Sequence, residues 1–366
     1  MKSYNWNKQK IISSRVLPDN MKKILLYELK ETKDEMTAFT KTVAPEVGLF
    51  AKYKEIDSMQ KSRLKEYSSS LYDFSMNFYK NCFTKTNTYI SKNSALDINA
   101  ELLVDELGRL IELLDDEDIT REFNTIFNDE REFVRIKDRN DKNLAITNLN
   151  GKCVSNPYSD DSYLSVYTRK DYSDFIHLAH ETGHALEHRL SYKSKSPIIQ
   201  TFLFETSSYL MELLMTYYIG NNLDLPTTAL MLESNRTTDI MDEGWNLLTI
   251  KYMEKELNFN PDIVNEKMNK LGRATNISEQ ALPELTRTTS LYSICKINSY
   301  MLAVELFYKI IADKEKGLYT WKQLINDPEE CIEELLNKYD LNYFNNQDNY
   351  QKMYSKALGL KKMYFE

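Results

Sequence analysis

Residues Asp174 to Leu190 read DFIHLAHETGHALEHRL and contain the motif HETGH, in which His180 and His184 stand four positions apart. On a helix this spacing places both imidazoles on one face, one turn apart, where they can bind the same metal ion. An HExxH motif is typical of two zinc ligands with a general base between them, which here is Glu181. The motif therefore predicts a metal site on a helix that spans this stretch.

The rest of the stretch is consistent with a buried helix. It carries all four histidines of the chain, His177, His180, His184 and His188, which fall within an arc of roughly 80° at about 100° per residue. Ser173 or Asp174 can cap its start. Gly183 is unusual, because glycine inside a helix costs about 1 kcal/mol relative to alanine. It indicates a close approach of another backbone or of the metal.

The composition predicts a mainly α-helical protein. The 366 residues include only 9 glycines and 8 prolines, and this low usage favours long helices over turn-rich sheets. The net charge of −8 argues against nucleic-acid binding and makes a cationic peptide the more natural electrostatic partner. The first 20 residues contain no apolar run that suits a signal peptide, and the chain has no apolar span of about 20 residues. We therefore expect a cytoplasmic protein with no membrane partner. The oligomeric state is left open.

Periodicity suggests two regions. We expect an N-terminal helical region over 1–130 and a second region over 131–366 that contains the metal helix. The second region divides into a small sheet over 131–170, the metal helices over 173–219 and C-terminal helices over 238–366. The fold class that we predict is a mainly α-helical arrangement of two lobes around a cleft, with a small sheet before the HExxH helix.

Individual elements follow from local patterns. Ser162 to Thr168 alternates tyrosine and serine with leucine and valine, which predicts a half-buried strand upstream of the metal helix. Before the sheet we expect helices over Asn20–Phe39, after Gly48, after a cap at Asp97, and over Asp118–Phe127. After the metal helix we expect helices over Pro197–Tyr218, Thr238–Leu257, Asp262–Leu271, Ser290–Ile311 and Pro328–Tyr339.

Two histidines do not complete a catalytic zinc site, which usually takes three protein ligands. The segment FETSSYLME, residues 204–212, supplies Glu205 and Glu212 two helical turns apart. Glu205 is our first choice for the third ligand, because 21 residues after His184 allow a second helix to return alongside the first. Glu212 could accept a hydrogen bond from a ligand imidazole, as metal-bound histidines generally require. For either glutamate, the alternative is a solvated helix residue.

These residues resemble the thimet oligopeptidase and oligoendopeptidase F family of zinc peptidases. HETGH is similar to the family's HExGH, ETSS followed by Glu212 is similar to its segment with the third ligand, and the run from Gly151 into the metal helix is similar to its hairpin and edge strand. The resemblance covers Gly151 to Glu212 and, loosely, the helix around Ser290–Leu306. It implies a helical zincin-type fold with a hairpin and an edge strand before the HExxH helix. It also implies one Zn²⁺ per chain on His180, His184 and Glu205, with Glu181 as base.

The sequence also departs from the family pattern. Thr182 stands where the family has an apolar residue, and His188 falls one place late, which leaves Glu187 at the expected position. A downstream histidine and a tyrosine cluster usually steady the substrate oxyanion, whereas this chain reads TRTTSLYSICKINSYMLA over residues 286–303. Tyr292 and Tyr300 are therefore the candidate oxyanion donors, with aromatic packing as the alternative.

Together these features predict a zinc metallopeptidase that hydrolyses short or unstructured peptides. Zinc would lower the pKa of a water molecule and polarise the peptide carbonyl, while Glu181 takes the proton. The strand Ser162–Thr168 could hold the extended peptide through main-chain hydrogen bonds. Two other readings stay open, namely a catalytically inactive relative that binds zinc and peptides, and a helical interaction protein in which HETGH is accidental.

Overall fold

The structure, a computed structural model, describes residues 98–128, 134–138, 151–155, 160–191, 203–237, 239–240, 243, 282–329, 332–341, 352, 355–357 and 359–364. The N-terminal region before residue 98, with the helices predicted there, lies outside the described residues. Almost all of Thr238–Leu257 and the whole of Asp262–Leu271 also lie outside them. The two-lobe arrangement and the division into 1–130 and 131–366 therefore stay predictions.

The first described elements are two amphipathic helices, α7 (Ala100–Leu114) and α8 (Glu117–Asn128). Their leucine, isoleucine and phenylalanine side chains are buried on one face, as the spacing predicted. Helix α7 is capped by Asn99, whose side chain accepts the backbone N–H of Leu102 at 2.9 Å. The predicted cap, Asp97, lies outside the described residues.

The predicted small sheet is present, with β1 (Val134–Asp138), β2 (Gly151–Ser155) and β3 (Ser162–Thr168) in the order β1-β3-β2. Strand β3 pairs in parallel with β1 and antiparallel with β2, so both of its hydrogen-bonding edges are occupied. All seven of its residues are buried. The predictions of a half-buried edge strand and of a peptide paired along it are therefore wrong. The alternation of tyrosine with leucine and valine was misleading, because tyrosine can also be buried on the second face of a central strand.

The metal helix is α9 (Ser173–Ser191), within one residue of the predicted stretch at each end. Its start is held by two aspartates in different ways. The side chain of Asp171 accepts the backbone N–H of Ser173 at 2.8 Å. Asp174 is fully buried and accepts the backbone N–H groups of the turn before the helix, at Arg169, Lys170 and Asp171. This clamp fixes how the chain passes from β3 into α9.

The remaining elements are α11 (Thr206–Asn221), a helical stretch over 226–237, α14 (Leu282–Ala312), α15 (Lys314–Asn326), α16 (Ile332–Lys338) and the short 3₁₀ helix η1 (Leu360–Tyr364). The prediction of a helix over Ser290–Ile311 is confirmed within a longer α14. The prediction that one helix runs from Pro197 is wrong, because α11 begins at Thr206, with Glu205 as its N-cap. The 226–237 helix and α15 were not predicted.

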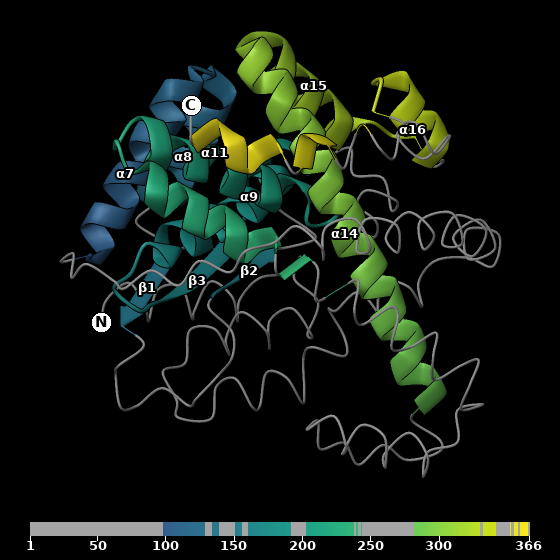
Figure 1. The fold of residues 1–366 in the computed structure, drawn as a ribbon, viewed down its shortest axis with the longest axis horizontal. Helices are drawn as coiled ribbons and strands as arrows, with labels where there is room; N and C mark the ends of the chain where they lie inside the picture. Colours follow the sequence, from purple (N-terminus) through teal and green to yellow (C-terminus); the bar gives the residue numbers. More distant parts are fainter. Residues whose placement is uncertain are drawn as a thin grey trace, which may run out of the picture.

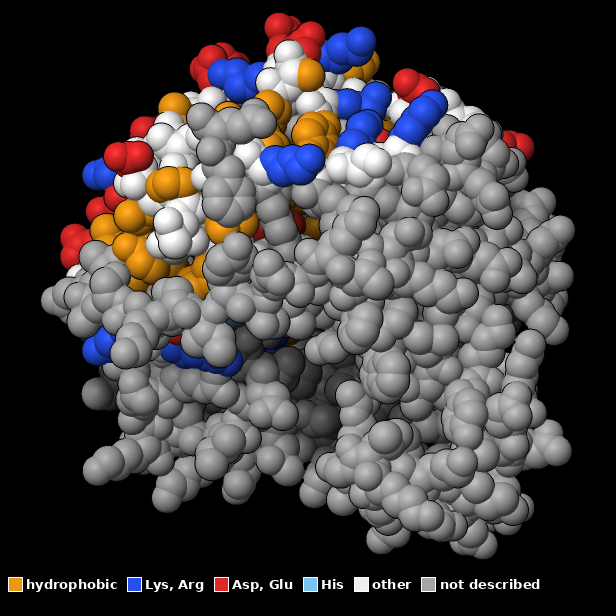
Figure 2. Space-filling model, in the orientation of Figure 1, with side chains coloured by type: hydrophobic (Ala, Val, Ile, Leu, Met, Phe, Trp, Pro, Cys, Tyr) orange, Lys and Arg blue, Asp and Glu red, His pale blue; other side chains and the backbone are white. Residues whose placement is uncertain are grey.

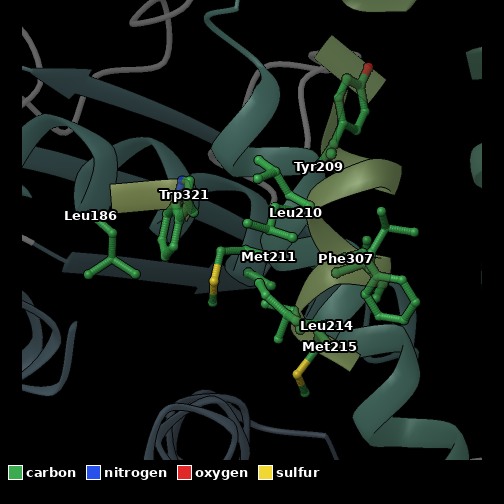
Figure 3. Packing of buried hydrophobic residues seen from close by; sticks show 14 of the residues in the cluster. Leu186, Tyr209, Leu210, Met211, Leu214, Met215, Phe307 and Trp321 are labelled. Carbon is green, nitrogen blue, oxygen red and sulfur yellow. The ribbon is translucent and has the colours of Figure 1, made fainter. Parts of the chain in front are cut away.

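Helix α11 lies at the centre of the described part. The sheet packs on α9, α9 packs on α11, and α11 packs on α14, so the metal helix lies between the strands and the central helix (Figure 1). Figure 3 shows Leu210, Met211, Leu214 and Met215 of α11 between Leu186 of α9 on one side and Phe307 of α14 on the other. Almost every side chain of α11 is buried. This core therefore determines how the two metal-site helices lie against each other.

The outer surface shows no dominant charge on the face in view. Lysine and arginine alternate with aspartate and glutamate at the top of the described part, where α15 lies (Figure 2). No helix among the described residues combines the length and the apolar character needed to cross a lipid bilayer.

Candidate metal centre

Three potential ligand atoms converge where α9 meets the start of α11. Glu205 Oε2 lies 3.2 Å from His180 Nε2 and 3.3 Å from His184 Nε2. The two histidines are about a fifth exposed, whereas the Glu205 side chain is nearly buried, at 8%. Within the described part of the chain, these residues form the only group of three that could hold a metal ion. The structure thus brings together the three residues that were predicted as ligands.

The spacing of these atoms suits a tetrahedral zinc site. Protein ligand atoms about 2.0 Å from a tetrahedral zinc ion are about 3.3 Å from one another, and the two distances to Glu205 Oε2 agree with this value. Glu205 Oε2 is also buried without a well-formed hydrogen bond to any described residue. A buried carboxylate oxygen in that state is costly unless a cation or donor satisfies it. The residues present therefore fit a bound metal.

The electrostatics of the cluster also favour a cation. Burial acts against a charge on Glu205, but His184 and His180 outweigh it and hold the pKa of Glu205 well below its usual value. Burial likewise acts against a charge on His180, but Glu205 and Glu212 outweigh it and raise the pKa of His180 well above its usual value. The cluster thus keeps Glu205 ionised, as a carboxylate ligand has to be, whereas a proton on His180 would leave when a metal ion binds.

Glu212 lies behind the first histidine, as predicted. Its Oε1 is 2.6 Å from His180 Nδ1, so an N–H at Nδ1 can donate to it while Nε2 faces Glu205. Burial would raise the pKa of Glu212, but Arg236 and His180 together hold it below its usual value. An ionised Glu212 therefore fixes both the ring orientation and the tautomer of His180.

Glu181, the predicted base, lies on the sheet side of α9. Its side chain is buried against strand β2, where a methyl group at Gly151 would come within 2.9 Å of Glu181 Cγ and Oε1. Burial raises the pKa of Glu181, and the neighbouring His180 and His184 only partly oppose this effect. A carboxylate whose pKa is raised toward the working pH is a better proton acceptor than an ordinary surface glutamate.

Gly183 explains how Glu205 reaches the histidines. A methyl group on Gly183 would lie 2.6 Å from both Ser207 O and Ser208 Cα, so the backbones of α9 and α11 are in direct contact. The predicted close approach at this glycine is therefore to another backbone. Trp321 of α15 supports the contact from outside by donating its indole N–H to Ser207 Oγ at 2.9 Å. Thr182, the departure from the family pattern, is fully buried, and its hydroxyl has no partner among the described residues.

Of the two predicted oxyanion donors, only Tyr300 has a described side chain. Tyr300 is fully buried and donates its hydroxyl hydrogen to Glu233 Oε1 at 3.1 Å. That hydroxyl is therefore committed to a core carboxylate, and the geometry gives no support to an oxyanion role for Tyr300. Tyr292 belongs to α14, but its side chain lies outside the described residues.

The two other histidines of α9 are not part of the three-residue cluster. Burial lowers the pKa of His177 to about 4, so this ring is neutral at physiological pH, and its Nδ1 has no partner among the described residues. His188 is buried near the end of the helix. The cluster therefore uses only the two histidines of the HETGH motif.

Two charged residues near the site, Glu233 and Arg236, were not predicted, and both lie in the helical stretch 226–237. Arg236 Nε lies 2.7 Å from Glu212 Oε2. A signal was present, because an acidic and a basic residue three positions apart follow the apolar run ALML and Pro226 stands at a favoured first position of a helix. Their proximity to Glu212 could not be foreseen, since 24 residues separate Arg236 from Glu212 along the chain.

Comparison with known proteins bears on the fold. No protein-family model matches the chain, and no curated protein matches its sequence. A solved structure named as an oligoendopeptidase F superposes with a TM-score of 0.57 at 11% identity, covering 100% of this chain and 75% of that one. One of the same name from Bacillus anthracis str. Ames gives 0.52 at 11%, covering 99% and 74%. PZ peptidase A with an inhibitor gives 0.53 at 11%, covering 100% and 75%. The chain therefore has the mainly helical fold, with a small sheet, of the oligoendopeptidase F structures.

Proposed function

We propose that this protein is a zinc-dependent peptidase that hydrolyses peptide bonds in short or unstructured peptides. The observation that carries the proposal is the convergence of His180, His184 and Glu205 at zinc-like spacing, with Glu181 on the same helix. The fold supports it, because the similar structures are named as an oligoendopeptidase F and as PZ peptidase A. The proposed cofactor is one Zn²⁺ per chain.

In the proposed reaction, zinc, Glu181 and Glu212 have different roles. Zinc, when bound, makes a water molecule more acidic and polarises a peptide carbonyl. Glu181 accepts the proton of the attacking water and can return it to the leaving nitrogen, so no covalent intermediate with the protein is needed. Glu212 keeps the His180 ring oriented through its 2.6 Å contact with Nδ1.

The proposal is tested by digesting a library of unstructured peptides with the purified protein, before and after zinc is removed with a chelator. We expect internal cleavage that stops on zinc removal and returns when one equivalent of zinc is added. A folded, stable protein serves as the control substrate and should remain intact. Cleavage that is indifferent to zinc removal would contradict the metal-dependent mechanism.

One observation favours a second candidate, a catalytically inactive relative that binds zinc and peptides. The hydroxyl of Tyr300, one of the two candidate oxyanion donors, donates to Glu233 Oε1 in this structure. The same library separates the two functions. Stoichiometric zinc and measurable peptide binding without cleavage of any peptide would identify the inactive relative, whereas cleavage excludes it.

The assignment of the ligands predicts the behaviour of a His184 variant. His184→Ala should lose the stoichiometric zinc of the wild-type protein, because two remaining ligands cannot hold the ion against a competing chelator. Elemental analysis after dialysis measures this directly. A full equivalent of zinc retained in the variant would show that the metal is bound elsewhere.

Substitutions at Glu205 and at Glu212 should lower zinc affinity to different extents. Glu205→Ala removes a proposed ligand, whereas Glu212→Ala removes only the acceptor behind His180, so the first change should weaken zinc binding more. For Glu212→Ala we expect a loss of about 10-fold to 100-fold. Zinc affinity measured by competition with a chromophoric chelator gives the order. The opposite order would exchange the roles of the two residues.

Gly151 should control the position of the general base. A methyl group there would collide with the Glu181 side chain at 2.9 Å and lie 3.2 Å from Ser165 O. The Glu181 side chain is the flexible partner and has to move, so Gly151→Ala should keep zinc and fold but lower kcat by about 10²-fold. Parallel measurements of zinc content and thermal midpoint serve as the control. Normal turnover in the variant would mean that the base does not depend on this packing.

A further inference from the structure

Arg236 occupies an unusual position for an arginine, buried among acidic side chains directly behind the candidate metal centre. Its side chain is only 3% exposed. Its Nε donates to Glu212 Oε2 at 2.7 Å, and its Nη2 donates to Glu212 O at 3.1 Å and to Thr216 Oγ1 at 2.7 Å. Its Nη1 donates to Glu233 Oε2. The guanidinium therefore holds both the carboxylate of Glu212 and the backbone of α11.

These contacts form one connected path to the candidate ligand His180. The two oxygens of Glu212 have different partners, with Oε2 facing Arg236 and Oε1 facing His180 Nδ1 at 2.6 Å. On the far side, Glu233 receives Arg236 through one oxygen and the Tyr300 hydroxyl through the other. The ring of Tyr209 contacts both His180 and Tyr300 edge-on, with centroids 5.9 and 5.7 Å away. The orientation of His180 is thus tied to side chains of the 226–237 helix and of α14.

We propose that Arg236, anchored by Glu233, is a positioning residue for the metal centre, which holds Glu212 in the one orientation that directs His180 Nε2 toward Glu205 and His184. The inference rests on the proposed function in assuming that zinc binds there. Arg236 does not touch the reacting atoms, and its effect passes through Glu212 to the ligand ring. Its planar fork of donors can satisfy Glu212, Thr216 and Glu233 together, which a lysine ammonium cannot do with the same geometry.

Charge balance explains why an arginine is needed there. Glu205, Glu212 and Glu233 place three carboxylates in a buried region, and unpaired buried charges are strongly unfavourable. Arg236 neutralises part of this charge on the side away from the metal site, and a divalent cation would neutralise the rest. Without Arg236, the Glu212 carboxylate would have only His180 to pair with among these contacts, and it could pull that ring away from the ligand position.

The experiment measures the zinc affinity of the full-length, metal-free protein by competition with a chromophoric chelator. The variants are Arg236→Lys, Glu212→Gln and the double variant. Arg236→Lys should weaken zinc binding about 10-fold, and Glu212→Gln should weaken it about 10-fold to 100-fold. Because both act through the same contact, the double variant should bind zinc no more weakly than Glu212→Gln, within about a factor of two.

Arg189 provides a matched control for loss of a buried arginine. It lies on α9 itself, its side chain is 7% exposed, and it pairs with Glu122 at 2.7 Å and with Asp160 at 3.4 Å. Arg189→Lys should lower the thermal midpoint of the metal-free protein but leave zinc affinity unchanged, whereas Arg236→Lys should change both. Equal loss of zinc affinity in the two variants would show that general destabilisation is the cause, and would overturn the proposal.

Other results of the same experiment would also overturn the proposed role of Arg236. If Arg236→Lys binds zinc as tightly as the wild type, or if its effect adds fully to that of Glu212→Gln, Arg236 does not act through Glu212 and the proposal is wrong. If Arg236→Lys fails to fold, the charge-balanced variant Arg236→Gln with Glu233→Gln replaces it, and wild-type zinc affinity in that variant overturns the proposal. A wild-type protein without zinc affinity would instead refute the proposed function, and this inference with it.

Discussion

Glu181→Gln should lower kcat for peptide hydrolysis by roughly 10³-fold and leave zinc stoichiometry unchanged. The amide keeps the shape of the side chain, so the packing against Gly151 is preserved. It cannot accept a proton, however, and the attacking water then has no base at the site. Burial raises the pKa of Glu181, which makes the native carboxylate a stronger base and increases what the substitution removes. The measurement is kcat on a cleaved peptide, with zinc content determined in the same preparation.

A matched control variant distinguishes the loss of the general base from the loss of stability that follows when any buried carboxylate is removed. Glu106 of α7 is also buried, bonds Arg109 at 2.6 Å and the Tyr218 hydroxyl at 2.6 Å, and is not a member of the metal cluster. Glu106→Gln should therefore lower stability without lowering kcat. Turnover of Glu181→Gln within a few-fold of the wild type would exclude Glu181 as the base, and a matching loss in Glu106→Gln would point to instability.

The parts of the site that could be predicted are those encoded by local spacing. His180, Glu181 and His184 lie on one helix, so the helical period alone places them on adjoining faces. Glu205 was predicted as the third ligand because two histidines do not complete a zinc site, but it was expected inside a helix. The structure places it at the N-cap of α11, with φ −100° and ψ 0° and no capping hydrogen bond from its side chain. That freedom leaves the carboxylate available to the histidines.

The parts that could not be predicted depend on contacts between distant segments. The pairing of β3 with β1 on one side and β2 on the other is a long-range property that the alternation of Ser162–Thr168 does not encode. In the same way, Glu233 and Arg236 form an ordinary i, i+3 pair along the sequence. Only the packing of the 226–237 helix against α11 turns this pair into support for Glu212.

Gly183→Ala on the metal helix should lower the free energy of unfolding by on the order of 3 kcal/mol. The added carbon would lie 2.6 Å from Ser207 O and from Ser208 Cα, and 2.8 Å from Ser207 C. These are backbone atoms and cannot rotate away, so α9 and α11 have to separate. Because Glu205 directly precedes α11, the separation also moves the proposed third ligand away from His180 and His184. Zinc affinity should therefore fall together with stability.

Gly108 of α7 provides a matched control, because the same substitution there should raise the free energy of unfolding instead of lowering it. A methyl group at Gly108 would lie 3.7 Å from the nearest atom, in the Phe123 ring, which is ordinary van der Waals contact. Gly108→Ala should then gain up to about 1 kcal/mol from helix propensity, with zinc affinity unchanged. Denaturant unfolding of both metal-free variants, with zinc competition on each, gives the comparison. If Gly183→Ala proved as stable as Gly108→Ala, the two helices would not be in backbone contact. The close approach that brings Glu205 to the histidines would then have to be abandoned.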